Sequence, residues 1–239
     1  MRKIAVILAG GEGHRAGGEE PKQFRKIGGH PMYQWSLKAF HEEDPETEIL
    51  LVCHPGAFDL LDILEGEREQ EPADSPWRNP ISFKEIVGGR SRYESVLNAL
   101  MEIEADKDTL VAVHDSARPL VSVEMIRRGW EKAAGNQSAV PVVDLLDSLR
   151  RREEDGETVP VNRADYLAVQ TPQIFRADIL KRAYDASDNP EFTDDASLVQ
   201  ASGVEISLYE GSHKNIKVTV PSDFIIAEAL LLAPSTENV

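Results

Sequence analysis

Short, almost fully apolar segments alternate with amphipathic helical patterns through the first 140 residues, and this alternation constrains the fold more than any other feature. The apolar segments cover residues 4–9, 48–53, 82–87, 109–113 and 138–143. The helical patterns between them cover residues 31–40, 93–101 and 123–134. Strands that are apolar along their whole length are typical of a parallel sheet with helices on both faces. We therefore expect an α/β fold with a mostly parallel sheet.

One interruption breaks this pattern at residues 144–163. Three consecutive arginines at 150–152 precede a short acidic run, and two extended stretches flank Asp155-Gly156, a dipeptide that favours tight hairpin turns. The pattern predicts a polar β-hairpin that projects from the core. Such an arm either contacts another subunit or is simply a surface hairpin exposed to solvent. The amino-acid composition of the segment does not distinguish these two alternatives.

Beyond the interruption the chain returns to regular elements. They are the segment 166–170, helices at 177–186 and 195–201, strands at 204–209 and 216–219, and a terminal helix opened by Pro221. A length of 239 residues fits one α/β unit. We expect a single domain over residues 1–239, with the arm at 144–163 inserted in it.

The charge balance excludes two classes of partner. The chain has 42 acidic residues against 26 Lys and Arg, which gives a formal net charge of -16. A surface this acidic repels nucleic acid and anionic lipid, so we expect neither as a general partner. An anionic small substrate remains compatible with this composition, but it would need cations clustered at one site.

The expected location is the reducing cytoplasm. Cys53 is the single cysteine, which excludes an intramolecular disulfide and a cysteine-rich zinc site. No apolar run approaches the roughly 20 residues that cross a membrane. Arg2 and Lys3 precede an apolar run as in a very short signal peptide, but that run ends in glycines without a cleavage pattern, which favours a buried first strand.

A long glycine-rich loop follows the first strand. It contains Gly10, Gly11 and Gly13, and it carries the cations Arg15 and Lys22. Glycines let a backbone approach a ligand closely, and open parallel sheets bind ligands at this edge. The loop fits a dinucleotide fingerprint only weakly and is not a P-loop. Backbone N–H groups with two cations suit a nucleoside triphosphate, and the alternative is a flexible loop with incidental charges.

Two more strand ends carry polar groups. Residues 87–95 form a second glycine loop, in which Ser91 is placed to cap the next helix. Asp115 ends the fourth strand, where a carboxylate can hold Mg²⁺ or a sugar hydroxyl. Arg118 could reach a phosphate or simply pair with Asp115. A metal phosphohydrolase lacks a suitable further ligand set, and a serine hydrolase lacks the Gly-x-Ser-x-Gly motif.

The C-terminal part offers weaker signals. Thr193-Asp194-Asp195 is typical of a helix N-terminus with acids in its first turn, which is mainly structural. Lys217 lies in an expected strand, either exposed on an edge or directed into the site.

Taken in order, six motifs resemble one family over nearly the whole chain. They are Ala-Gly-Gly-x-Gly-x-Arg with Pro21-Lys22-Gln23, Gly88-Gly89 with Arg92 and Ser95, His114-Asp115-x-Ala117-Arg118-Pro119, Gln170-Thr171-Pro172-Gln173, Thr193-Asp194-Asp195-Ala196 and Asn215-Ile216-Lys217-Val218-Thr219. This series resembles the 2-C-methyl-D-erythritol 4-phosphate cytidylyltransferase family of the non-mevalonate isoprenoid pathway. Ribitol-5-phosphate cytidylyltransferases share most of these motifs, but they tend to have valine where this chain has Ala117.

The resemblance implies a Rossmann-like nucleotidyltransferase core, a homodimer linked by the projecting arm, and Mg²⁺ or another divalent cation. The substrates would be CTP and a polyol phosphate, with pyrophosphate as the second product. A phosphate monoester is already an anion at neutral pH, so the reaction needs no general base and depends on positioning and charge neutralisation. An inert nucleotide-binding regulatory module is the alternative from another class. Retention of Arg15, Lys22 and Lys217 together argues against it.

The resemblance also implies residue roles. The catalytic residues would be Arg15, Lys22 and Lys217. The nucleotide-binding residues would be Ala9, Gly10, Gly11, Gly13, Gly89, Arg92, Ser95 and Asp115. The residues that bind the sugar phosphate would be Ser148, Arg163 and Thr219, the first two from the neighbouring subunit. Asp115 would also hold the metal.

Two positions depart from the family pattern. Ala16 stands where the family usually has methionine. The family's Asp-Thr-x-Lys segment is matched best by Asp147-Ser148-Leu149-Arg150, which keeps the hydroxyl and the positive charge, while Asp144-Leu145 competes for the register.

Overall fold

A computed structural model describes residues 1–11, 21–187 and 192–233. In this part of the chain, eight strands form the central sheet: β1 (Arg2–Ala9), β4 (Glu48–Cys53), β5 (Lys84–Val87), β6 (Thr109–Asp115), β7 (Ser138–Asp144), β10 (Leu167–Val169), β11 (Gln173–Arg176) and β12 (Leu208–Glu210). Their order is β10-β7-β11-β6-β1-β4-β5, with β12 paired to β7. The pairs β1–β4, β1–β6, β4–β5 and β7–β12 are parallel, which confirms the mostly parallel sheet.

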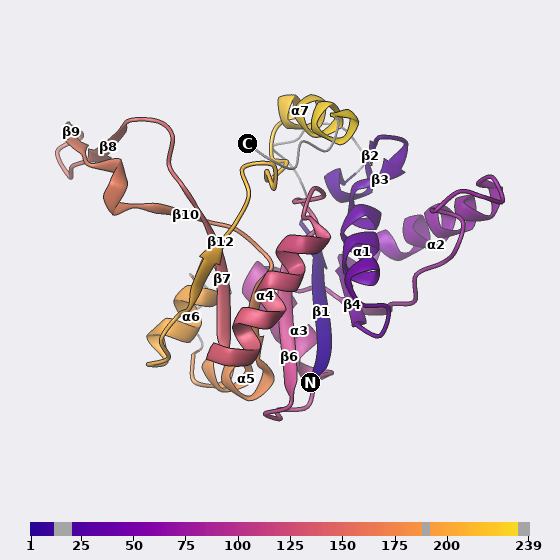
Figure 1. The fold of residues 1–239 in the computed structure, drawn as a ribbon, viewed down its shortest axis with the longest axis horizontal. Coiled ribbons are helices and arrows are strands. Elements are labelled where there is room, and N and C mark those ends of the chain that lie inside the picture. The colour runs from indigo at the N-terminus through magenta and orange to yellow at the C-terminus, as the bar shows by residue number, and fades with distance from the viewer. Residues whose placement is uncertain (12–20, 188–191, 234–239) are drawn as a thin grey trace.

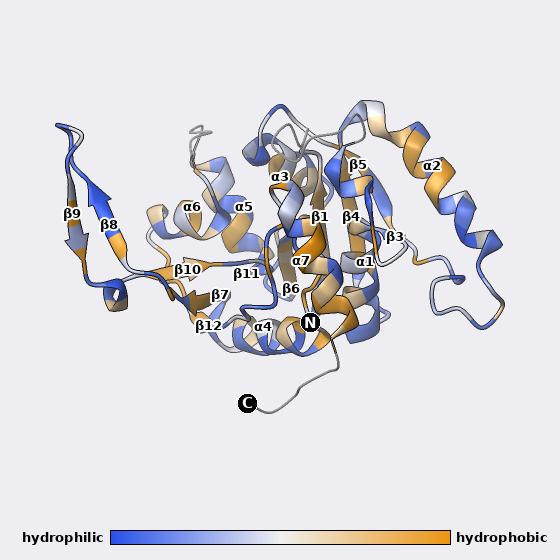
Figure 2. Ribbon diagram, turned by 90° about the horizontal axis from the view of Figure 1, so that it is seen from above, coloured by the Kyte–Doolittle hydropathy of each residue, from blue (hydrophilic) through white to orange (hydrophobic). Residues whose placement is uncertain are grey.

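Seven helices are described: α1 (Met32–Glu43), α2 (Phe58–Glu67), α3 (Arg92–Met101), α4 (Val123–Asn136), α5 (Ala177–Asp185), α6 (Asp195–Ala201) and α7 (Pro221–Leu232). Helices α3, α5 and α6 cover one face of the sheet, and α1 and α4 cover the other (Figure 2). No helix in the described ranges is long and apolar enough to cross a membrane.

The first strand shows why both faces are covered. Ala5 and Ile7 pack into the hydrophobic core under α1 and α4, whereas Ile4 and Val6 pack into the core under α3 and α5. Successive strand residues point to opposite faces, so a strand that is apolar throughout needs helices on both sides. The apolar runs of the sequence therefore predicted this layering.

Short elements complete the fold. Strands β2 (Lys26–Ile27) and β3 (His30–Pro31) form a small hairpin, and the 3₁₀ turns are η2 (Lys22–Phe24), η3 (Pro55–Ala57), η4 (Arg68–Gln70) and η5 (Arg163–Asp165). Helix α7 contacts this hairpin through a small third core, which includes Phe224 and Ile27. Helix α2 and the segment after it extend away from the sheet (Figure 2).

The expected arm is present as a hairpin. Strands β8 (Leu149–Arg152) and β9 (Thr158–Val161) pair antiparallel, and Gly156 in the turn has a φ of 87°, a conformation that favours glycine. The hairpin projects from the ends of β7 and β10, well away from the helical layers (Figure 1). The arm residues are mostly exposed in this single chain.

The structure corrects several expectations. Residues 216–219 are not a strand; Val218 donates one backbone hydrogen bond to Ala117, and no ladder continues from it. Strands β5 and β12 begin later than expected, at Lys84 and Leu208. Strand β11 was not predicted. It enters antiparallel between β6 and β7, in the middle of the sheet.

Candidate active site

A cavity of about 710 Å³ opens at the carboxyl ends of β1, β4, β5 and β6. Each of these strands is followed by residues that line it: Gly10 and Gly11 after β1, His54 and Pro55 after β4, Gly88 and Gly89 after β5, and Ser116 and Ala117 after β6. Parallel strands place their carboxyl ends at one edge of a sheet, and ligands of open α/β sheets bind at that edge. The four strand ends thus converge on one site.

The second glycine loop is packed too tightly for side chains. A Cβ atom at Gly88 would lie 3.1 Å from the Cys53 carbonyl oxygen, and one at Gly89 would lie 2.2 Å from Cβ of Glu94. Ser95 fixes the loop, because its hydroxyl accepts a 3.1 Å hydrogen bond from the Gly89 N–H and donates one of 2.8 Å to the Ser91 carbonyl. Ser91 caps α3 as expected.

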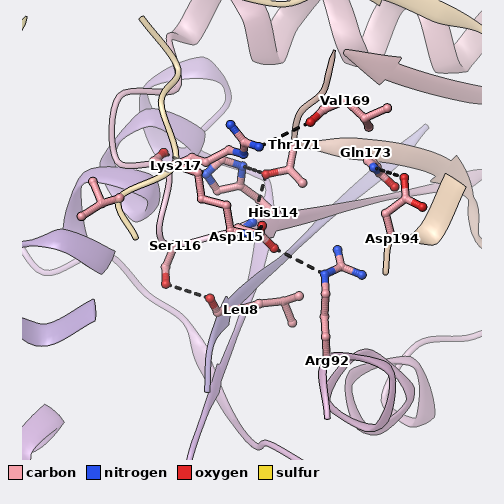
Figure 3. Close-up of polar contacts among 12 residues, drawn as sticks. Leu8, Arg92, His114, Asp115, Ser116, Val169, Thr171, Gln173, Asp194 and Lys217 are labelled. Carbon is pink, nitrogen blue, oxygen red and sulfur yellow. Dashed lines mark hydrogen bonds and ion pairs between the residues drawn. The ribbon is translucent and has the colours of Figure 1, made fainter. Parts of the chain in front are cut away.

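Asp115 lies between two cations on the cavity floor (Figure 3). Its Oδ2 accepts a 2.7 Å hydrogen bond from Lys217 Nζ, and its Oδ1 lies 3.5 Å from Arg92 Nε. Burial alone would raise the pKa of Asp115, but the charges of Arg92 and Lys217 outweigh burial and hold that pKa well below its usual range. The carboxyl is therefore an anion at neutral pH.

Arg92 has a second carboxylate partner that the sequence analysis missed. Its guanidinium forms hydrogen bonds of 3.1 and 2.7 Å to the two carboxylate oxygens of Asp195, which is fully buried. The Tyr184 hydroxyl donates a further 2.7 Å hydrogen bond to Asp195. In the sequence Asp195 resembles a plain first-turn acid beside the capping residue Asp194. No local pattern distinguishes the two, because the contact with Arg92 spans 103 residues.

Lys22 joins the first loop to the C-terminal segment. Its Nζ donates a 3.0 Å hydrogen bond to the Val218 carbonyl, one residue after Lys217. The neighbouring Gln23 is buried and donates a 2.6 Å hydrogen bond to the Ala9 carbonyl at the end of β1. The Gln23 contact holds the turn η2 against the end of β1, and the Lys22 contact links that turn to the segment before α7.

Most of the predicted nucleotide and catalytic residues line the cavity. They are Ala9, Gly10, Gly11, Lys22, Gly89, Arg92, Ser95, Asp115 and Lys217, together with Thr219 from the sugar-phosphate set. Gly13 and Arg15 lie outside the described residues. Thr219 donates a 2.9 Å hydrogen bond to Asp223 in the first turn of α7.

The two arm residues are not brought to the cavity within one chain. Ser148 and Arg163 are exposed on the arm, and Arg163 donates to the Leu146 carbonyl there. Neither residue lines the cavity.

The cavity also has lining residues that were not predicted. His54 and Pro55 follow β4 directly, and their position after a buried strand is a signal that could have found them. Arg90 and Glu94 pair with each other beside the second loop, with 3.1 Å between Nη2 and Oε1.

Among the described residues, Asp115 is the cavity carboxylate that best fits a metal ion, since Glu94 is paired with Arg90. The described residues contain no group of three or more His, Cys, Asp or Glu side chains that could hold a cation. Mg²⁺ is commonly bound through one or two carboxylates plus substrate phosphates, so a single ionised aspartate fits such an ion when a triphosphate is bound. Asp115 meets this requirement, since the contact of its Oδ1 to Arg92 is a long one.

Comparisons with known proteins agree with one another. The family model for 2-C-methyl-D-erythritol 4-phosphate cytidylyltransferase matches residues 3–233. A protein of that name from Bacteroides fragilis is 41% identical over 238 residues, which cover 97% of this chain and 100% of the relative. A chloroplastic rice protein of that name is 37% identical over 95% of this chain and 73% of its own length. The crystal structure of the Thermus thermophilus protein of that name superposes with a TM-score of 0.75 at 33% identity, covering 98% of this chain and 100% of that one.

Proposed function

The chain belongs to the 2-C-methyl-D-erythritol 4-phosphate cytidylyltransferase family, and from this premise we propose how its residues divide the work of the reaction. The enzyme transfers CMP from CTP to 2-C-methyl-D-erythritol 4-phosphate and releases pyrophosphate, a step of isoprenoid biosynthesis. The observation that carries the assignment of roles is the meeting of a glycine-rich strand end, Lys22, Lys217 and the ionised Asp115 in one cavity.

The chemistry needs positioned charge more than proton transfer. A phosphate oxygen of the acceptor attacks the α-phosphorus of CTP, the bond from that phosphorus to the bridging oxygen breaks, and pyrophosphate leaves with the bond's electron pair. The attacking oxygen already carries negative charge, so no residue has to remove a proton. Preorganised cations lower the barrier by stabilising the charge that develops on the phosphoryl oxygens.

The cations take different parts of the substrates. Lys22 holds the triphosphate together with Arg15, which lies outside the described residues. Lys217 reaches the acceptor phosphate near Thr219, because both residues belong to the segment after β12. Arg92 is held by Asp195 and contributes to the nucleotide side of the cavity. The backbones of Ala9, Gly10, Gly11, Gly13 and Gly89, with Ser95 behind Gly89, contact the nucleotide.

A divalent cation, Mg²⁺ in our proposal, completes the charge balance. Asp115 would hold it together with phosphate oxygens of CTP. Such a cation supplies charge neutralisation to the phosphates when it is bound. Asp115 also pairs with Lys217 through one carboxylate oxygen and with Arg92 through the other.

We further propose a homodimer in which the arm at residues 144–163 carries Ser148 and Arg163 into the cavity of the neighbouring subunit. The support is that one chain leaves both residues exposed and away from its own cavity. In this proposal residues 1–239 form one nucleotidyltransferase domain. The enzyme works in the cytoplasm, where the single cysteine stays reduced.

The test of these roles compares two lysines of one segment. Lys217→Ala removes the ammonium that contacts Asp115, whereas Lys214→Ala removes an exposed ammonium three residues earlier. With CTP and 2-C-methyl-D-erythritol 4-phosphate, pyrophosphate release should fall about 10²–10³-fold in the first variant and stay near wild type in the second. Equal activity of the two variants would refute the role of Lys217.

A further inference from the structure

The segment that carries Lys217 has no secondary structure of its own between β12 and α7. Its backbone hydrogen bonds to the sheet region lie near its two ends: the Gly211 N–H donates to the Val142 carbonyl at 2.8 Å, and the Val218 N–H donates to the Ala117 carbonyl at 2.8 Å. Such a segment holds a reactive side chain in place only if something fixes the stretch between these two points.

Gln170 fixes the segment at Ser212, which is the first fixed point. Its side-chain amide pairs with both backbone groups of that residue, as a neighbouring strand would. Its side-chain oxygen accepts a 3.1 Å hydrogen bond from the Ser212 N–H, and its amide nitrogen donates one of 2.8 Å to the Ser212 carbonyl. The side chain is 6% exposed. A buried amide with both hydrogen bonds made holds a backbone in one arrangement. Breaking either bond would leave a polar group buried without a hydrogen-bond partner, which costs free energy.

Asn215 supplies the second fixed point, two residues before Lys217. Its side chain is fully buried, and its amide nitrogen donates a 2.9 Å hydrogen bond to the Thr171 carbonyl and a 3.3 Å bond to Gln170 Oε1. Its backbone carbonyl accepts a 2.8 Å hydrogen bond from Arg118 Nη1. The residue thus links the Lys217 segment to the connection between β10 and β11.

We propose that Gln170 and Asn215 form an amide clamp that positions the Lys217 ammonium against Asp115. This inference rests on the proposed function, because it takes Lys217 to act on the substrates. Neither amide lines the cavity, so both act through the backbone of residues 212–217. Figure 3 shows the Lys217 side chain, which the clamp would position, beside Asp115, together with Thr171, whose hydroxyl accepts a hydrogen bond from the Asp115 N–H. A misplacement of about 1 Å at a reacting group can lower a rate about 10²-fold.

The experiment uses two clamp variants and one control. Asn215→Ala removes the second fixed point, and Gln170→Met removes the amide of the first while keeping its volume. Gln34→Met is the control, since Gln34 is an equally buried amide on α1 that donates to Glu65 and does not line the cavity. We expect kcat to fall about 10–10²-fold in both clamp variants and less than about twofold in the control, at matched folded fractions.

A double-mutant cycle with Lys217→Ala distinguishes mispositioning of Lys217 from a general loss of protein stability. If the clamp acts through Lys217, adding Gln170→Met or Asn215→Ala to Lys217→Ala should lower kcat by less than about twofold further. A full multiplicative loss in the double variants would overturn the proposal. If Lys217→Ala alone has normal turnover, the role of Lys217 fails instead, and that result is distinct from a failure of the clamp.

Folding is measured on the same samples by circular dichroism and thermal unfolding. If both clamp variants fail to fold while Gln34→Met folds, the amides are folding determinants and the positioning proposal is rejected. If a clamp variant folds and retains the wild-type kcat, the proposal is likewise overturned.

Discussion

At the scale of single residues, the cavity is organised by alternating charges. Lys217, Asp115, Arg92 and Asp195 follow one another as cation, anion, cation and anion, joined by contacts between 2.7 and 3.5 Å. Each carboxylate in this series therefore faces a cation, which is how buried charges are tolerated. Lys22 also lines the cavity, and its ammonium donates a hydrogen bond to the Val218 carbonyl. The proposed triphosphate site thus combines paired carboxylates and cations at the base of the cavity with the additional cations that we assign from the first loop.

Lys22→Ala should lower turnover far more than it lowers stability. Lys22 begins the short turn η2 and is not among that turn's buried residues, so its loss removes a cation from the proposed triphosphate site and little from the core. We expect a rate loss of about 10²–10³-fold, about 3–4 kcal/mol in the barrier, measured by pyrophosphate release. The matched control is Lys26→Ala, which breaks an exposed 2.8 Å ion pair with Glu67. Near-normal turnover of Lys22→Ala would contradict the assignment.

Cys53 should be a packing residue. Its side chain is fully buried in β4, and burial followed by the nearby charge of Glu85 raises the pKa of the thiol to about 12. A thiol in this state is neither a nucleophile nor readily alkylated at neutral pH. We expect Cys53→Ala to keep its activity and the native protein to resist iodoacetamide until it is unfolded. Rapid alkylation of folded protein would show that the site is open.

The sequence predicted the position of single residues at the cavity where a motif and a strand end coincide. Asp115 ends β6 and Gly89 closely follows β5, so the alternation of elements places both at the sheet edge. Asp195 and Asn215 could not be assigned their roles in this way. Their contacts join parts of the chain that are 103 and 44 residues apart, and one sequence carries no record of such pairs.

At the scale of elements, β11 is a strand that the hydrophobic periodicity of the sequence does not predict. Residues 173–176 are four residues long, follow a proline and offer no recognisable alternation, yet they form the antiparallel strand between β6 and β7. Its place is set by burial of Ile174 and Phe175 on opposite faces of the sheet. By contrast, the segment 216–219 has an alternating pattern typical of a strand, but it joins no ladder. One backbone hydrogen bond, from Val218 to Ala117, and contacts of Lys22 and Lys217 hold it in place.

The hairpin β2–β3 offers a pH test. The His30 ring stacks on Trp77 with centroids 4.0 Å apart, and burial is the main cause that lowers the pKa of His30 below 6.5. Below pH 6.5, His30 binds a proton in the unfolded chain while the folded protein keeps the ring neutral. The contribution of His30 to folding stability is therefore fully present above pH 6.5 and is lost as the pH falls through the lower pKa of the folded state. The stability difference between wild type and His30→Gln should therefore shrink from pH 8 to pH 5.

Urea unfolding at the two pH values measures that difference. His41→Gln is the control, since His41 is exposed near the end of α1. A difference between wild type and His30→Gln that stays constant with pH would mean that His30 is not kept neutral by the fold.

At the scale of the whole molecule, the arm should make each active site depend on two chains. One chain would carry Lys22→Ala and the other Arg163→Ala, so each homodimer lacks one group in both sites. In a mixed dimer, one site collects both lesions and the other collects neither. Random exchange makes half of the dimers mixed, and half of their sites are intact, so activity should recover to roughly a quarter of wild type.

The control for this experiment mixes Lys22→Ala with Lys217→Ala. Both lysines line the cavity of the same chain, so every site of a mixed dimer keeps one lesion and no activity should return. Mixed dimers of Lys22→Ala and Arg163→Ala that are confirmed by mass spectrometry but inactive would rule out a shared site. Arg163 would then act in its own subunit or not at all.

The most direct test of the account measures which substrates the cavity accepts. Pyrophosphate release is recorded for CTP, UTP, ATP and GTP, each with 2-C-methyl-D-erythritol 4-phosphate and with ribitol 5-phosphate. The account predicts the highest kcat/KM for CTP with the erythritol phosphate, and a loss of that activity in Lys217→Ala but not in Lys214→Ala. Comparable turnover with ATP or GTP, or a preference for the ribitol phosphate, would contradict it.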